Sequence, residues 1–138
     1  MRIDFTVPGI PVGKARPRVT MHGTYTPKKT REYEALIRQS WAEQSGQKLP
    51  DGVPIRLKLT VCFPIPRSYS NRLKRLLPGK PHSKLPDLDN CIKSASDGCQ
   101  GYAFKNDSCI YSIEAYKIYA ERPEMRIVLE TVGHEEKP

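Results

Sequence analysis

The sequence predicts a small α/β (α+β) domain, in which helices pack on one mixed β-sheet. Three observations lead to this prediction. Apolar and polar residues alternate in four separate stretches, which is typical of strands, and two stretches between them have helical spacing instead. The length of 138 residues suits one hydrophobic core, because about 100 residues is already a usual domain size. We therefore treat residues 1–138 as a single domain.

The strands are predicted from the period-two alternation of their side chains. The clearest stretch is Pro54–Phe63, where every second residue is apolar. The other three are Arg2–Val7, Ser108–Ala120 and Glu124–Val132. Within the third stretch, unbroken alternation would put Ile110 and Ser112 on the same face of the sheet.

Two helices are predicted from apolar residues spaced three and four apart. Thr26 suits the N-cap of the first helix, Pro27 suits its first position, and Gly46 suits its end. The second helix is expected from Asp89 to about Cys99, with Gly98 or Gly101 as the residue that ends it.

Two connecting segments are rich in proline. The segment Pro8–Pro17 is expected to be an extended arm, because proline donates no amide hydrogen bond to a sheet. The segment Pro64–Pro86 is expected to be a long excursion containing a short helix at Tyr69–Leu77. The polar tail Gly133–Pro138 is expected to be frayed.

The formal net charge of +8 predicts a polyanionic partner, and its distribution supports DNA. The segment Pro64–Pro86 contains basic residues and no acidic residue. The candidate phosphate contacts are Arg67, Arg72, Lys74, Arg75, Lys80 and Lys84 in this segment, and Lys14, Arg16 and Arg18 in and beside the arm. For any one of them, a solvated surface position is the alternative.

Other functions are disfavoured by composition. The four cysteines form no CxxC pair and the three histidines are scattered, which argues against a zinc site. The sequence contains no secretory signal pattern and no apolar run near the ~18 residues of a membrane span. We expect a cytoplasmic protein with reduced thiols.

Candidate catalytic residues begin where the basic segment ends. Asp87 and Asp89 are two residues apart, and in an extended segment such residues point to the same side. Their carboxylates could then converge on Mg²⁺, which prefers oxygen ligands. Lys93 lies one helical turn after Asp89, and Asp97 lies another turn on. A lysine in that position could orient a nucleophile or stabilise charge on a phosphate.

Asp107 follows Asp89 by 18 residues and precedes a predicted strand. It can join the first two aspartates only if the linker Gly101–Asn106 runs back along the helix. Structural alternatives exist for each residue: Asp89 could cap the helix or pair with Lys93, and Asp107 could be a turn residue.

From these residues alone, several classes of function stay open. Carboxylates directly after a basic segment would weaken phosphate binding unless a cation lay between the carboxylates and the phosphate. A metal-dependent nuclease would explain this placement. A DNA-binding module without catalysis is the main alternative. A restriction-type nuclease would use Glu135-Glu136-Lys137 in the tail, and a purely structural protein has no obvious use for the basic segment.

The sequence resembles the RusA family of Holliday junction resolvases. The match comprises Asp87-Leu88-Asp89-Asn90, Lys93, Asp97-Gly98 and the region of Asp107. The opening, Pro11–Arg18 followed by Tyr25-Thr26-Pro27, is similar to that of phage and prophage members, and the resemblance spans about Ile3 to Leu129. The stretch Tyr69–Lys84 departs from short family members because it is longer.

The resemblance implies a RusA-like endonuclease that resolves four-way DNA junctions by paired symmetric nicks. It implies that Asp87, Asp89 and Asp107 ligate Mg²⁺, and that Lys93 assists catalysis or DNA contact. It also implies a homodimer with one metal site per subunit, in a bacterial or prophage setting. A two-fold dimer suits a junction, because two strands of like polarity must be cut.

Overall fold

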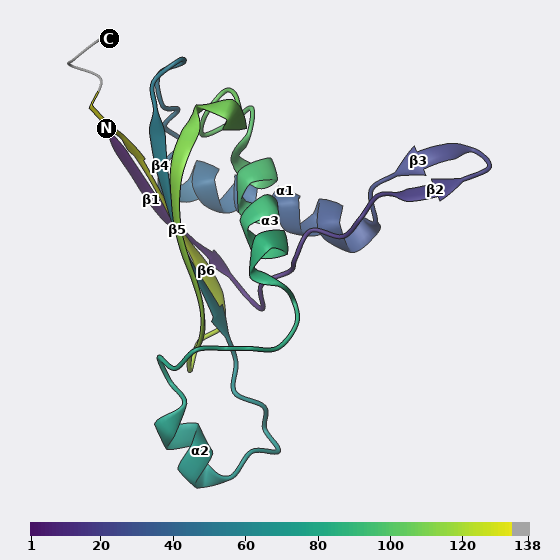
Figure 1. Cartoon of the computed structure of the whole chain (residues 1–138), viewed down its shortest axis with the longest axis vertical. Coiled ribbons are helices and arrows are strands. Elements are labelled where there is room, and N and C mark those ends of the chain that lie inside the picture. The colour runs from purple at the N-terminus through teal and green to yellow at the C-terminus, as the bar shows by residue number, and fades with distance from the viewer. Residues whose placement is uncertain (134–138) are drawn as a thin grey trace.

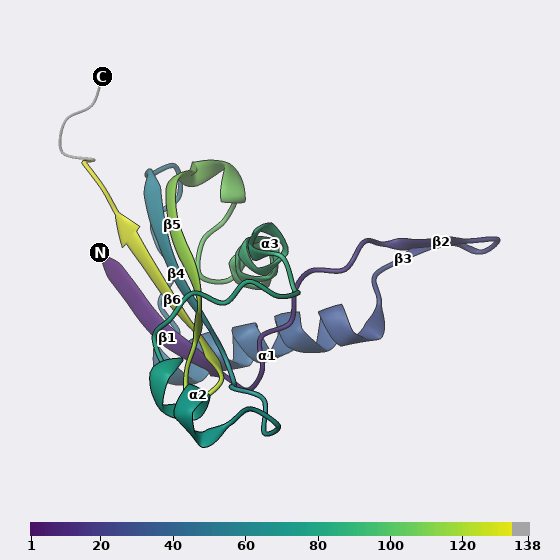
Figure 2. The same cartoon turned by 60° about the horizontal axis from the view of Figure 1, so that its bottom comes forward.

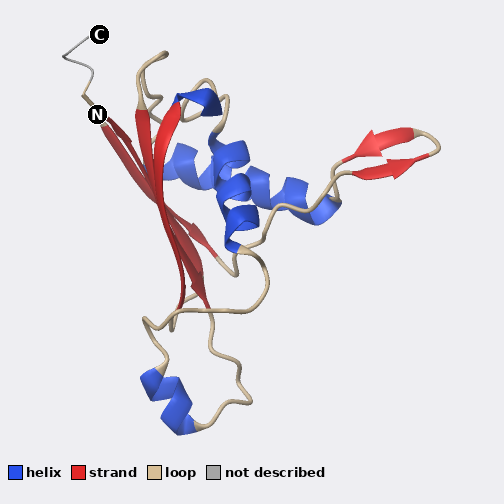
Figure 3. Ribbon diagram, in the orientation of Figure 1, coloured by secondary structure: helices blue, strands red, loops and turns tan. Residues whose placement is uncertain are grey.

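The computed structural model describes residues 1–133, so the Glu135-Glu136-Lys137 spacing and the tail beyond Gly133 lie outside the described residues. The predicted fold class is confirmed. Four strands form one mixed sheet in the order β1-β6-β4-β5, and two helices, α1 and α3, cover one face of it (Figure 3). In the described part of the chain no helix has the length and apolar character needed to cross a membrane.

The elements follow one another along the chain as Figure 1 shows. Their bounds are β1 (Arg2–Pro8), β2 (Arg18–Thr20), β3 (Gly23–Tyr25), α1 (Lys28–Gln44), β4 (Ile55–Phe63), α2 (Asn71–Leu76), α3 (Leu88–Cys99), a 3₁₀ turn (Asp107–Cys109), β5 (Ile110–Tyr119) and β6 (Glu124–Thr131). All four predicted strands and both predicted helices are present, as is the short helix in the basic segment.

The core lies between the sheet and the two helices. β6 pairs antiparallel with β1 and β4, whereas β5 pairs parallel with β4 because α3 forms the crossover between them. The alternating residues Leu57, Leu59 and Val61 of β4 are buried on the helix-covered face. α1 and α3 cross closely at Gly98, where an added Cβ would lie 2.8 Å from Ile37. Gly98 therefore serves helix packing and does not end α3. The helix ends at Cys99, and Gly101, with a positive φ of 85°, follows its C-cap residue Gln100.

The two edges of the sheet differ. At the β1 edge, the Gln44 side chain accepts a hydrogen bond from the Thr6 N–H at 2.9 Å and donates one to the Thr6 carbonyl at 2.7 Å. At the β5 edge, the loop Gly79–His82 pairs only with Lys117–Tyr119. In the described residues, the segment Ile110–Tyr116 has no strand beside it on that edge.

Several predicted details are wrong. α1 begins one residue late, with Pro27 rather than Thr26 at the N-cap position and no side-chain cap. A β-bulge at the start of β5 puts Ile110 opposite the buried Ile55 and Ser112 opposite Arg56, so Ile110 and Ser112 lie on different faces. The sequence analysis also missed the hairpin β2–β3, because its two strands are only three residues each.

Candidate active site

Asp87 and Asp89 lie at the N-terminus of α3. Asp87 occupies the N-cap position with extended backbone (φ −65°, ψ 146°), and its side chain makes no capping hydrogen bond. Asp89 lies in the first helical turn rather than at the cap. Asp87 is therefore extended, but the expected extended geometry is wrong for Asp89, and the alternative role of Asp89 as the helix cap is wrong as well. Both carboxylates stay exposed at a helix N-terminus, where the helix dipole favours negative charge.

Both aspartates open into one cleft of about 480 Å³. One wall is α3, from its N-terminal end to Asp97, and the other is the arm before the hairpin. The lining residues are Lys14, Ala15, Arg16, Pro17, Asp87, Asp89, Asn90, Lys93 and Asp97. The structure thus brings together five of the predicted site residues, namely Asp87, Asp89, Lys93, Lys14 and Arg16.

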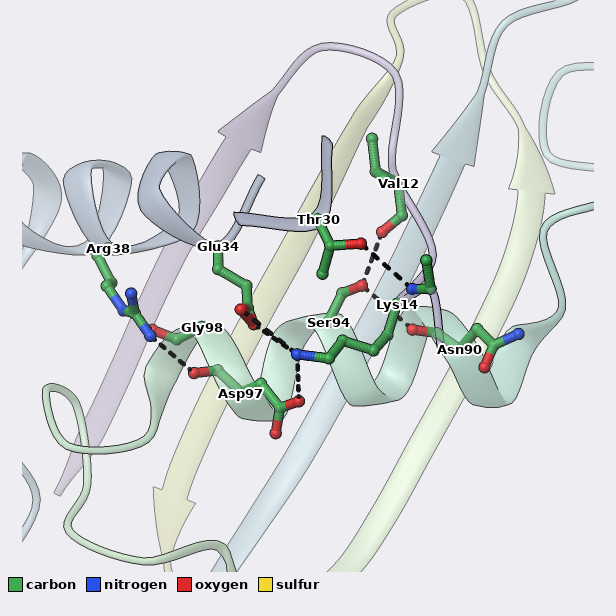
Figure 4. Close-up of polar contacts among 10 residues, drawn as sticks. Val12, Lys14, Thr30, Glu34, Arg38, Asn90, Ser94, Asp97 and Gly98 are labelled. Atoms are coloured by element: carbon green, nitrogen blue, oxygen red, sulfur yellow. Dashed lines mark hydrogen bonds and ion pairs between the residues drawn. The ribbon is translucent and has the colours of Figure 1, made fainter. Parts of the chain in front are cut away.

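Hydrogen bonds from the backbone of the arm to α3 fix its position (Figure 4). The Lys14 N–H donates to the Asn90 carbonyl at 2.9 Å, and the Ser94 hydroxyl donates to the Val12 carbonyl at 2.7 Å. The contact is close at Gly13, where an added Cβ would lie 2.8 Å from the Cβ of Pro86. The shape of the cleft is therefore determined by the fit of the arm on α3.

Lys14 holds the arm with its side chain as well. Its ammonium lies 3.1 Å from a carboxylate oxygen of Glu34 on α1 and 3.1 Å from one of Asp97 on α3 (Figure 4). Burial by itself lowers the pKa of Lys14, but the hydrogen bonds to Glu34 and Asp97 outweigh this effect and the pKa is raised. Lys14 thus has protein partners, and its contact with DNA phosphate stays a prediction.

Glu34 is the site residue that the sequence analysis missed. It is 8% exposed and lies on the inward face of α1 with Tyr33 and Ile37. An acid among the apolar positions of a helix is a usable signal, because a buried carboxylate needs a cationic partner. Finding that the partner is Lys14 requires the fold.

Lys93 on α3 and Arg16 on the arm are exposed side chains that both line the cleft. The alternative of an ion pair between Asp89 and Lys93 is not realised among the described residues, where Asp87 and Asp89 have no salt bridge. The cleft therefore offers free carboxylates and free cations side by side. Such an arrangement can hold a hard cation and a phosphate at neighbouring positions.

Asp107 lies at the other end of α3. The linker does not run back along the helix, because the Gly101 N–H bonds to the Phe104 carbonyl at 2.7 Å in a compact turn. The Asp107 N–H then bonds to the side chain of Gln100, the C-cap residue, at 3.0 Å. Eleven residues of helical rise separate Asp89 from Gln100, or about 17 Å.

Within one chain, the three aspartates therefore do not meet. Among the described residues, no group of three histidine, cysteine, aspartate or glutamate side chains is placed to hold a metal ion. The carboxylates of Asp87 and Asp89 lie exposed at one end of α3, and the carboxylate of Asp107 lies exposed near the other end.

The basic segment, with α2, projects beyond the end of the sheet (Figure 1). Its predicted phosphate contacts are exposed, namely Arg67, Arg72, Lys74, Arg75, Lys80 and Lys84. Lys84 donates a hydrogen bond to the Tyr69 hydroxyl at 2.7 Å, which lowers the pKa of Tyr69. The segment is tied to β5 through the Lys117 ammonium, which donates to the Lys84 carbonyl.

Comparison with known proteins assigns this arrangement to a family. The family model described as Endodeoxyribonuclease RusA matches residues 8–130. The chain belongs to the RusA family. It is also similar to the uncharacterized protein YqaN of Bacillus subtilis (strain 168), with 30% identity over 148 residues that cover 95% of this chain and 97% of YqaN.

Family membership confirms the resemblance predicted from the Asp87–Asp89 motif. The protein is an endodeoxyribonuclease, a hydrolase that acts on DNA, and its family comprises metal-dependent enzymes that resolve Holliday junctions in recombination. A DNA-binding module without catalysis is thereby disfavoured.

Proposed function

We propose that this RusA-family protein resolves four-way DNA junctions by paired symmetric nicks, with Mg²⁺ held by Asp87 and Asp89. The observation that carries the proposal is the pair of exposed carboxylates, without salt bridges among the described residues, in a cleft whose opposite wall is basic. Two carboxylates with water and a substrate phosphate are a usual ligand set for Mg²⁺. The donors present therefore fit this ion.

The residues of the cleft have separate roles in the proposal. Asp87 and Asp89 would hold the Mg²⁺, which would supply positive charge to stabilise the phosphate during cleavage. Lys93 and Arg16 hold the non-bridging oxygens of that phosphate from opposite walls, which fixes its orientation. Lys14, with Glu34 and Asp97, keeps the arm at the distance that admits one DNA strand.

We further propose that the active form is a homodimer joined through the free part of the β5 edge. Ile113 supports this proposal in two ways. It is the midpoint of the segment Ile110–Tyr116, which has no strand beside it in the described residues. It also lies opposite the buried Leu57, hence on the helix-covered face, and yet it is 47% exposed. A second β5 strand, paired antiparallel about Ile113, would cover it and extend the sheet.

This dimer gives Asp107 a role in catalysis. Antiparallel pairing about Ile113 sets residue 107 of one copy level with residue 119 of the other. That end of β5 is also the end at which α3 begins, since Lys117 contacts the segment leading to Asp87. We propose that Asp107 of a second copy completes the ligand set of Asp87 and Asp89. Each dimer then has two such sites related by its two-fold axis.

We propose that the enzyme works in the cytoplasm, on recombining bacterial or prophage DNA. The four cysteines support a reducing compartment, because none forms a disulfide and three of them are buried.

The test is cleavage of a synthetic four-way junction and of linear duplex, each with Mg²⁺ and with EDTA. We expect symmetric nicks in the junction only with Mg²⁺. The Asp89→Asn variant should lose about a hundredfold or more in rate. The matched control is Asp4→Asn, an exposed aspartate of β1 outside the cleft. Equal cleavage in EDTA, or an active Asp89→Asn enzyme, would contradict the proposed metal site.

A further inference from the structure

The hairpin β2–β3 is an exposed projection that the proposed chemistry does not use. Every residue of both strands is exposed, and the hairpin extends away from the sheet and helices in both views (Figure 1 and Figure 2). Val19 in β2 is 80% exposed, and Met21 in the connecting turn is 97% exposed. Apolar side chains in these positions add nothing to the core, and a two-stranded hairpin this short has little stability of its own. Their presence therefore calls for a partner.

The hairpin has a defined shape. Arg18 pairs with Tyr25 and Val19 with Thr24, which puts the first pair on one face and the second pair on the other. The turn is closed by the Thr20 hydroxyl, which donates to the Gly23 carbonyl at 3.1 Å. A positive φ of 117° at Gly23 makes the turn possible. The apolar turn is thus presented at the end of a narrow, two-stranded element.

The charge around the hairpin identifies the chemistry of the partner. From residue 5 to residue 31 the chain has no acidic residue and six basic ones. Arg16 before the hairpin lines the active-site cleft, and Arg18 and Lys29 line an adjoining hollow of about 380 Å³ at the base of the hairpin. Phosphate groups could thus be held on both sides of the hairpin, with its apolar turn between them.

We propose that the hairpin is a wedge that enters the open centre of a branched DNA, with Val19 and Met21 against the end faces of the base pairs there. The proposal rests on the proposed function, because it takes branched DNA as the substrate. Insertion into a continuous duplex costs a few kcal/mol to unstack a base step, whereas a branch point already has ends at which stacking is easily broken. The wedge therefore favours junctions over linear DNA.

The position of the hairpin next to the cleft also determines where, relative to the branch point, the DNA strand would be cut. Only Pro17 separates Arg16, in the cleft wall, from the first residue of β2. A hairpin seated in the branch point would therefore place the active site on a strand close to that point. The wedge selects the branched substrate and positions its phosphates, while Asp87 and Asp89 belong to the catalytic site.

The test uses the full-length Val19→Ser/Met21→Ser double variant and a four-way junction with 2-aminopurine beside the branch point, in EDTA so that no cleavage occurs. We expect the wild type to raise the 2-aminopurine fluorescence, because the base loses its stacking partner, and the variant to leave it unchanged. We expect junction affinity to fall about tenfold and affinity for linear duplex to stay within about twofold. The matched control, Ile10→Ser, changes an apolar residue that is 60% exposed outside the hairpin and should behave like the wild type.

The outcomes separate this inference from the proposed function. Wild-type fluorescence and junction preference in the double variant would overturn the wedge, even if the wild-type enzyme cleaves junctions with Mg²⁺. An equal loss of affinity for junction and duplex would also overturn it, because the hairpin would then be a general DNA contact. A wild-type protein that unstacks the branch but never cleaves would instead contradict the proposed function.

Discussion

The two ends of α3 carry the same kind of residue in different settings. At the N-terminal end, Asp87 and Asp89 open into a cleft that the arm closes from the other side. At the C-terminal end, Asp107 lies exposed in a compact turn, with Gln100 bound to its backbone N–H. About 17 Å of helix separates these ends. This difference supports our proposal that each chain supplies two halves of an acidic site, each completed by its counterpart from another copy.

The two edges of the sheet are the basis of our proposal for how two copies pair. The β1 edge is occupied by the Gln44 side chain, which bonds to both backbone groups of Thr6. The β5 edge is occupied only at Lys117–Tyr119 in the described residues, and Ile113 lies half exposed beside the free part. A sheet with one protected and one free edge can extend in one direction only, which gives a closed dimer rather than a fibre.

The largest expected effect comes from Asp107→Asn. Although Asp107 lies far from the cleft of its own chain, its loss should slow junction cleavage about a hundredfold or more, as the loss of Asp89 does. Binding to the junction in EDTA should be retained. Single-turnover cleavage rates would measure the effect, with Asp51→Asn as the control, since Asp51 is also exposed and pairs with Lys105 near the same end. Full activity in Asp107→Asn would show that the N-terminal end of α3 suffices.

Ile113→Asp tests the free edge. Two like charges facing each other across the two-fold axis should weaken the dimer about a hundredfold, while each chain stays folded because Ile113 is already half exposed. Sedimentation velocity over a range of concentrations would measure the dissociation constant. Leu76→Asp, a change at an exposed position of α2, is the control. A dimer unchanged by Ile113→Asp would place the interface elsewhere.

Lys14→Met tests the ion pairs that hold the arm against the helices beside the cleft. Removing the ammonium leaves Glu34 buried without its cation, which should lower the free energy of unfolding by about 2 kcal/mol. Adding Glu34→Gln should restore part of that loss, because the uncompensated charge is then removed. Urea unfolding of both single variants and the double variant would measure the coupling. Purely additive losses would mean that Lys14 and Glu34 act independently.

The smallest expected effect is on the pH dependence of stability and comes from His82. This residue lies in the loop Gly79–His82, which pairs with Lys117–Tyr119 of β5. Its ring stacks on Phe63 at 4.3 Å, and burial, with the charges of Lys117 and Lys84, lowers its pKa. Because the pKa of His82 is lowered on folding, the neutral imidazole contributes fully to the free energy of unfolding above about pH 6.5. That contribution is lost as the pH falls through the pKa of the folded state. Urea unfolding at about pH 7.5 and about pH 5.5 should show less pH dependence for His82→Phe than for the wild type.

Much of the fold could be predicted from the sequence, because most strands and helices have a recognisable pattern of neighbouring residues. Period-two alternation in Pro54–Phe63 located the central strand, and Gly46, with φ of +67°, ends α1 as expected. The hairpin β2–β3 was not predicted, since strands of three residues are too short for alternation to be recognised. The bulge in β5 was not predicted either, because it depends on pairing with a strand far away in the sequence.

The candidate site was predictable only in part. Asp87, Asp89 and Lys93 are close in sequence, so their shared place at the start of one helix could be anticipated. The pairing of Lys14 with Glu34 and Asp97 depends on how the arm crosses two helices, which no local spacing encodes. The position of Asp107 depends on the turn after α3, and its proposed role depends on a second copy of the chain.

The most direct test of the shared site is to mix two inactive variants. Asp89→Asn and Asp107→Asn chains, co-expressed in equal amounts, should form mixed dimers as about half of all dimers. In each mixed dimer one site combines Asp89 of one chain with Asp107 of the other and is complete, whereas the second site lacks both. We expect about a quarter of wild-type nicking, confined to one strand of each junction. Absence of any restored nicking, with mixed dimers demonstrated by mass spectrometry, would contradict a site built from two copies.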